Sequence, residues 1–245
     1  MKWIEPDWPA PANVRALSTT RDGGVSDGVF AGLNLGAHVG DEPARVEANR
    51  ARLQQAAQIP GPLNWLNQVH GTAVHSVSDQ YDVAPDADAA CAHEAGQACI
   101  VMTADCLPVL FCDRAGTVVA AAHAGWRGLK EGVLEASIAA MGCEPGEILA
   151  WLGPAIGPAA FEVGSEVREA FMAEQAEAVG AFVPSANDGK WLADIYLLAR
   201  LRLARAGVSA VYGGEFCTFS DGDQFYSYRR DGQTGRMASI IWLAR

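Results

Sequence analysis

The sequence predicts an α/β or α+β fold, a single layered α/β/α domain over residues 1–245 with mixed sheets covered by helices. Two observations support this prediction. Short apolar runs typical of buried strands alternate with amphipathic stretches of helical periodicity. The 245 residues are 50% hydrophobic and 19% charged, and no repeat, low-complexity tract or linker divides them. A chain of this length can bury a sizeable core without disulfides.

Four segments have helical periodicity, with apolar residues on one side and a start or stop signal at an end. Proline follows two acidic residues at the start of the first segment, and a serine can cap the third. Glycines follow the second and the fourth. The four expected helices comprise residues 41–59, 128–141, 165–179 and 195–206.

Six short runs rich in Val, Leu, Ile and Ala are expected to be buried strands. Some of the connections between them are too short for a crossover, which favours antiparallel pairing at those places. The runs are residues 98–102, 107–112, 117–122, 148–152, 208–212 and 237–243.

The charge balance limits the partners that the protein can bind. The formal net charge is −11, so the surface as a whole repels nucleic acid and anionic lipid. The longest apolar stretches, such as residues 117–122, are far shorter than the roughly 20 residues that span a bilayer. The first residues lack the basic start and apolar core of a secretory signal, so we expect a cytoplasmic protein.

The six cysteines are expected to be thiols, because a cytoplasmic chain of this size has no need of disulfides. No CxxC pair exists, so zinc-ribbon and thioredoxin-type interpretations have no support. Any cysteine that binds a metal must therefore act singly.

Three segments each place a histidine or cysteine at the edge of an expected strand: Asn67-Gln68-Val69-His70-Gly71, the stretch TADCLP around Cys106, and AAHAGWRG around His123. Two imidazoles and one thiolate suit a catalytic zinc, which typically has three protein ligands and one open position. The separations of 36 and 17 residues match no compact zinc motif, so proximity must come from the fold. Cys106 as a small core residue and His70 as a hydrogen-bonded loop histidine remain alternatives.

At these segments the chain resembles the laccase-domain (YfiH-type) family, and the likeness covers nearly the whole sequence. NQVHG, TADCLPVLF and AAHAGWRG look like the three signature segments of that family. The likeness continues through STTRDGGVSDGVFAGLNLG, GPAIGPAAFEVG and FYSYRRDGQTGRM. The resemblance implies that His70, Cys106 and His123 are metal ligands and catalytic residues. It also implies one of three activities: polyphenol oxidation with copper, zinc-dependent purine nucleoside phosphorolysis with adenosine deamination, or editing of peptidoglycan precursors.

The histidine content favours zinc over a copper relay, although copper remains the alternative metal. A multicopper oxidase needs several copper centres with multiple imidazoles, whereas this chain has five histidines and no His-x-His pair. A mononuclear zinc suits hydrolytic deamination because it lowers the pKa of its water. A carboxylate must then act as acid and base, and the candidates are Asp105, Glu162 and Glu166.

Phosphorolysis requires cationic or N–H groups that hold phosphate. Arg127 is the first candidate, followed by Arg21 and by the pair Arg229 and Arg230, each of which could equally be a surface cation. Aromatic side chains can stack on a purine. The candidates for stacking are Trp126, Phe30, Phe161, Phe225 and Tyr226.

The function that we predict is a zinc-dependent purine nucleoside enzyme. It phosphorolyses adenosine, inosine, guanosine and methylthioadenosine, deaminates adenosine, and is favoured to be a monomer. Its partners are then the nucleoside and phosphate, with no nucleic acid and no membrane. Three alternatives remain. The first is an amidase that edits wrongly built UDP-muramoyl precursors, with Cys106 as nucleophile and His123 as base. The others are a copper polyphenol oxidase and a non-catalytic protein whose structural metal has Cys217 or Cys112 as a fourth ligand.

Overall fold

The computed structural model describes residues 1–77 and 83–244. Its centre is a six-stranded mixed sheet in the order β12-β8-β6-β7-β4-β3. Strand β6 pairs antiparallel with both β7 and β8, while β12 runs parallel to β8 and β3 parallel to β4. The strands are β3 (Val74–Ser76), β4 (Ala89–Ala92), β6 (Leu107–Asp113), β7 (Val119–Ala124), β8 (Ile148–Leu152) and β12 (Ala210–Gly213).

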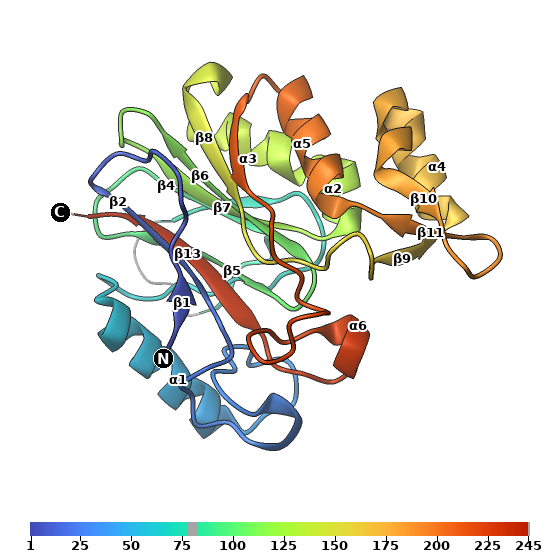
Figure 1. Ribbon diagram of the computed structural model, residues 1–245. Helices are drawn as coiled ribbons and strands as arrows, with labels where there is room; N and C mark the ends of the chain where they lie inside the picture. Colours follow the sequence, from blue (N-terminus) through green and yellow to red (C-terminus); the bar gives the residue numbers. More distant parts are fainter. Residues whose placement is uncertain (78–82, 245) are drawn as a thin grey trace.

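A second sheet of four antiparallel strands, in the order β1-β2-β13-β5, packs against one face of the first (Figure 1). Alternate residues of β6 and β13 lie in different core clusters. Leu110 faces Ile241 between the sheets, whereas Phe111 and Ile240 face outwards toward the helices. Both faces are thus buried, which explains the continuous apolar runs. The strands are β1 (Trp3–Ile4), β2 (Val14–Thr19), β5 (Ala98–Thr103) and β13 (Met237–Leu243).

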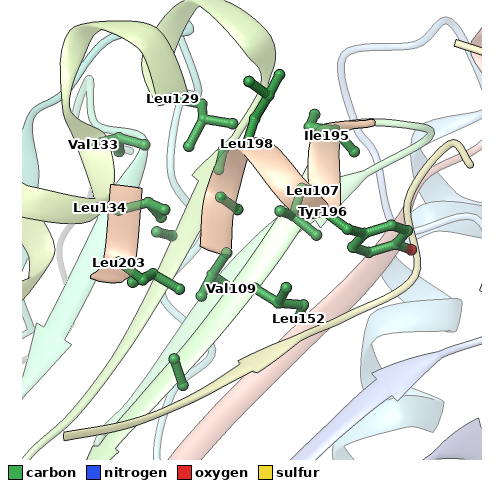
Figure 2. Close-up of a cluster of buried hydrophobic side chains, with 14 of the residues drawn as sticks. Leu107, Val109, Leu129, Val133, Leu134, Leu152, Ile195, Tyr196, Leu198 and Leu203 are labelled. Atoms are coloured by element: carbon green, nitrogen blue, oxygen red, sulfur yellow. The ribbon is translucent and has the colours of Figure 1, made fainter. Parts of the chain in front are cut away.

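Helices cover the outer faces of both sheets (Figure 1). Helix α1 (Pro43–Ala57) packs on the four-stranded sheet through Leu53. Helices α2 (Trp126–Glu131), α3 (Val133–Met141) and α5 (Ile195–Arg205) pack on the six-stranded sheet. Figure 2 shows their contact, in which leucine and valine side chains from these helices meet side chains from β6 and β8. The expected mixed α/β class with helix-covered sheets is confirmed, and its β layer is two sheets deep.

Two of the expected helices are shorter than predicted. The segment expected as one helix over 128–141 is two helices, α2 and α3. They are separated by Gly132, which has φ of +104°. Glycine adopts this value easily, but it is not a helical conformation, so the helix is interrupted here. The segment 165–179 forms α4 (Ser165–Glu174) and then a 3-10 turn, Ala176–Ala181. No helix of the described residues is long and apolar enough to cross a membrane.

A small third sheet was missed by the sequence analysis because its strands are three or four residues long and partly exposed. It has the order β10-β11-β9 and lies beside α4 (Figure 1). Its strands are β9 (Glu162–Gly164), β10 (Phe182–Pro184) and β11 (Lys190–Ala193). The remaining elements are α6 (Tyr228–Asp231) and two 3-10 turns, Gly28–Phe30 and Pro145–Glu147.

Candidate metal centre

The three segments singled out in the sequence meet at one place. Cys106 directly precedes β6, and His123 lies near the end of β7, where it pairs with Pro108 across the hairpin. His70 lies in the loop before β3, in a left-handed conformation with φ of +62°. One ligand atom from each of the three side chains lies within 4.8 Å of the others. The fold therefore closes separations of 36 and 17 residues into a single cluster.

A glycine lets these three side chains approach one another. A Cβ atom built on Gly125 would lie 3.0 Å from Sγ of Cys106 and 3.1 Å from Cδ2 of His70. Glycine three residues later has a similar role, because a Cβ on Gly128 would lie 2.8 Å from the carbonyl oxygen of Gly71. The two glycines of the AGWRG segment thus bring helix α2 close to the His70 loop and leave room for the ligand atoms.

The electrostatics of the cluster favour a thiolate. Burial alone would raise the pKa of Cys106, but His123 and His70 beside it lower that pKa to about 6. Burial likewise opposes a charge on His123, yet Cys106 and Asp88 raise its pKa above the ordinary value. Two imidazoles and a thiolate are the donors that zinc and copper accept, so the residues fit a metal ion.

Asp88, which the sequence analysis missed, lies behind the cluster and is completely buried. Its Oδ1 accepts hydrogen bonds from Nδ1 of His123 at 2.8 Å and from the backbone N–H of His70 at 2.9 Å. Its Oδ2 accepts from the N–H groups of Val69 at 3.1 Å and Gly71 at 2.7 Å. Nothing in the short stretch around Asp88 distinguishes it from the other acidic residues near it, so only the fold reveals this contact.

The cluster opens into a cavity of about 390 Å³. Arg127 of α2 and Arg229 of α6, two of the candidates for phosphate binding, line this cavity. Arg236 and His38 also line it and were missed. Burial lowers the pKa of Arg236, while Cys106 and Asp105 lie close enough to oppose that shift. Several cationic or hydrogen-bonding groups thus surround the candidate metal ligands of an acidic protein.

Four of the predicted polar residues do not line the cavity: Arg21, Glu162, Glu166 and Arg230. The guanidinium of Arg21 donates to backbone carbonyls of Ala31 and Gly222 and lies 4.7 Å above the ring of Tyr226. Glu162 accepts hydrogen bonds from the side chains of Asn187 and Ser185. Arg21 and Glu162 therefore hold neighbouring segments together outside the cavity.

Asp105 lines the cavity, but both of its oxygens are used within the protein. Oδ1 accepts from Oγ1 of Thr218 and Oδ2 from the backbone N–H of Arg229, each at 2.6 Å. This arrangement favours a role in anchoring α6 over proton transfer to a substrate. Arg230, the neighbour of Arg229, donates to the backbone carbonyls of Thr218, Phe219 and Phe225, so it also holds this region together.

Among the predicted aromatic residues, Trp126 and Phe161 line the cavity, together with Tyr228. Phe225 and Tyr226 are completely buried elsewhere. Neither Cys217 nor Cys112 belongs to the cluster of mutually close ligand atoms, which has three members within residues 1–77 and 83–244. Three donors are typical of a catalytic metal with an open position, whereas structural zinc has four.

The family model described as multi-copper polyphenol oxidoreductase laccase matches residues 15–244. The chain belongs to this laccase-like family. Over 241 residues, 98% of each chain, it is 60% identical to a Pseudomonas aeruginosa protein named purine nucleoside phosphorylase PA4543. It is 57% identical over 242 residues, 99% of each chain, to purine nucleoside phosphorylase YfiH of Escherichia coli K12.

Solved structures of the laccase-like family have the same fold. The crystal structure of Neisseria meningitidis protein NMB0706 superposes with a TM-score of 0.96 at 56% identity, covering 100% of both chains. YlmD from Geobacillus stearothermophilus superposes with a TM-score of 0.93 at 32% identity, covering 100% of this chain and 97% of that one. This member of the family thus combines the shared fold with a His-Cys-His cluster, a cavity beside the cluster, and arginines around it.

Proposed function

We propose that this protein is a zinc-dependent purine nucleoside phosphorylase that also deaminates adenosine. Its substrates are adenosine, inosine, guanosine and methylthioadenosine. The observation that carries the proposal is the placement of three metal-ligand side chains in a cavity lined by arginines and aromatic rings. The names of the relatives from Pseudomonas aeruginosa and Escherichia coli support the phosphorylase activity.

His70, Cys106 and His123 would hold the metal. A zinc ion held by these three donors would supply a Lewis acid next to the substrate. The chain's own contribution is to keep the Cys106 thiolate and the two imidazoles close together beside an open cavity.

Arg127 and Arg229 bind the phosphate in this proposal, and Arg236 adds a third cation. Nη1 of Arg229 donates to the carbonyl oxygens of Glu162 at 2.9 Å and Ala160 at 3.4 Å, which fixes its position and leaves other N–H groups for an anion. Phosphate is otherwise repelled by a protein with a net charge of −11, so local arginines are needed to concentrate it. They also stabilise the negative charge that phosphate brings to the reaction.

The purine stacks on aromatic rings at the wall of the cavity. Trp126 and Phe161 each lie under an arginine, with the guanidinium carbons of Arg127 and Arg229 at 5.2 and 5.7 Å from the two ring centres. An aromatic face next to a cation suits a ligand that has a flat base at one end and an anion at the other. A nucleoside with phosphate beside its sugar has this shape.

We expect zinc-loaded protein to release hypoxanthine from inosine only when phosphate is present, and to release ammonia from adenosine without phosphate. Chelation followed by gel filtration should abolish both reactions, and added zinc should restore them. Base release and ammonia are measured on protein of known metal content. Fully metallated protein that turns over neither nucleoside contradicts the proposal.

Replacing Arg229 with alanine should raise the KM for phosphate, because a charge-assisted hydrogen bond contributes about 1.5–3 kcal/mol, or about 10- to 100-fold in binding. The matched control is Arg52→Ala, which removes an exposed arginine of α1 that does not line the cavity. Initial rates at varied phosphate concentration give the comparison. Equal KM values for the two variants would remove Arg229 from the phosphate site.

A second candidate function is the amidase that edits UDP-muramoyl precursors. It is favoured by one contact pattern: Cys106 lies against His123, whose Nδ1 donates to Asp88, as in a cysteine nucleophile with an oriented base. Metal dependence separates the two candidates. Hydrolysis of a muramoyl-amino-acid substrate that continues after chelation would favour the amidase with a Cys106 nucleophile.

A further inference from the structure

We propose that Asp88 is the positioning residue of the metal centre, and that its single carboxylate sets the orientation of both histidine ligands. This inference rests on the metal site used in the proposed function, but it concerns binding of the metal and does not depend on the identity of the substrate.

The first half of the argument concerns His123. The Oδ1 atom of Asp88 accepts from Nδ1 of His123 at 2.8 Å, which keeps the proton on Nδ1 and leaves Nε2 as the free donor atom. A backbone hydrogen bond also joins the two residues: the N–H of His123 donates to the carbonyl oxygen of Asp88 at 2.7 Å. Ring and peptide of His123 are thus both tied to the same residue.

The second half concerns the loop that carries His70. The Asp88 carboxylate accepts hydrogen bonds from three consecutive N–H groups, those of Val69, His70 and Gly71. The middle residue has φ of +62°, a left-handed conformation that residues other than glycine rarely adopt. Three N–H groups that converge on one buried carboxylate stabilise this bend, and the bend carries the His70 ring to Cys106 and His123.

The hydrogen bonds to Asp88 also show how it can act. A carboxylate offers about four lone-pair sites, and Asp88 receives four hydrogen bonds, two on each oxygen. Its side chain is completely buried and does not line the cavity. No acceptor capacity is left for a metal ion or a substrate, so Asp88 acts through the two histidines.

Asparagine at this position tests the inference with little change in volume. Its amide oxygen can replace one carboxylate oxygen, but its NH2 group would face N–H donors where the other oxygen stands. Either the bonds that Oδ1 accepts from His123 and His70, or those that Oδ2 accepts from Val69 and Gly71, must then be lost. We expect Asp88→Asn to bind zinc about 10- to 100-fold more weakly, as is typical when a partner of a metal-bound histidine is removed.

The chain offers a matched control in Asp113, another buried aspartate that holds a loop. Its oxygens accept from the backbone N–H groups of Thr117 and Val118 at 2.7 and 3.0 Å and from Oγ1 of Thr117 at 2.6 Å. It is 5% exposed and hydrogen-bonds no metal ligand. We therefore expect both Asp113→Asn and Asp88→Asn to lower thermal stability, and Asp113→Asn to leave zinc affinity unchanged.

The measurements are zinc affinity by competition with a chromogenic chelator, and the absorption spectrum of the cobalt-substituted protein, which reports ligand geometry. They are made on full-length protein without nucleoside or phosphate. We expect Asp88→Asn to weaken zinc binding and change the cobalt spectrum, and Asp113→Asn to do neither. If Asp88→Asn does not fold, Asp88→Glu is measured, since it keeps the charge but displaces the oxygens and should change the same two readouts.

Two outcomes overturn the inference. One is an Asp88 variant with unchanged zinc affinity and cobalt spectrum. The other is an equal loss of affinity in Asp113→Asn, which would assign the effect to general destabilisation. The proposed function fails differently: an unaltered chain that binds zinc but turns over no nucleoside contradicts the phosphorylase and leaves the role of Asp88 standing, whereas an unaltered chain that binds no metal removes both.

Discussion

Replacing Cys106 with alanine is expected to abolish metal binding and nucleoside turnover together. The thiolate is the one anionic donor of the cluster, and its pKa of about 6 means that it is charged at neutral pH. If zinc binding by four-ligand sites is worth roughly 10–16 kcal/mol, one ligand averages roughly 3 kcal/mol, or at least about 100-fold in affinity. Zinc content after dialysis and inosine phosphorolysis measure the two losses on the same sample.

Cys112→Ala is the matched control for this experiment. Cys112 lies in β6, the strand that directly follows Cys106, and is completely buried between the two sheets. Its loss should cost packing energy without changing zinc content. Full zinc occupancy in Cys106→Ala would remove Cys106 from the ligand set, and loss of inosine phosphorolysis with zinc retained would give the thiol a role other than metal binding.

Two of the three cluster residues, Cys106 and His123, are brought together by the hairpin that the sequence predicts. The expected strands 107–112 and 117–122 form β6 and β7 with a short connection, and in the observed register Pro108 pairs with His123. That pairing places Cys106 opposite the Gly125 end of β7, close to His123. Local hydrogen bonding of adjacent strands therefore brings the two ligands together, and such pairing can be inferred from a sequence.

The place of the third residue, His70, could not be derived from strand and helix patterns. His70 joins the cluster through a loop whose bend depends on Asp88, and that contact has no local signal in the sequence. In the same way, Arg236 and His38 reach the cavity from segments distant in the chain. Its residue type at an expected strand edge and the motif resemblance both indicated His70, and the fold explains why it lies beside the other two.

The errors in secondary structure have similar causes. Apolar periodicity continues through residues 128–141, but Gly132 has φ of +104° and breaks the helix. The periodicity alone therefore predicts one helix that is too long. Strands such as β1 and β9 have two or three residues, too few for a periodic signal, and they exist because longer strands beside them provide hydrogen-bond partners.

The second large effect is expected for Gly125→Ala. The backbone of Gly125 has φ of −61° and ψ of 157°, which alanine adopts without strain, so the substitution tests crowding alone. The added methyl carbon would lie 3.0 Å from Sγ of Cys106 and 3.1 Å from Cδ2 of His70, and 3.7 Å from Cε1 of His123. Cys106 and His70 must then shift by a few tenths of an ångström, whereas 3.7 Å to His123 is an ordinary van der Waals contact, so the fold can persist.

We expect Gly125→Ala to lower zinc affinity by about 10-fold or more while the melting temperature of the metal-free protein stays near its original value, because the displaced atoms are the ligands themselves. Gly146→Ala is the control, since a Cβ there meets no atom within 4 Å. Chelator competition, cobalt spectra and thermal melts are compared for both variants. An unchanged affinity and spectrum in Gly125→Ala would mean that the cluster adapts freely to a methyl group in its midst. The close approach to this glycine would then have no part in metal binding.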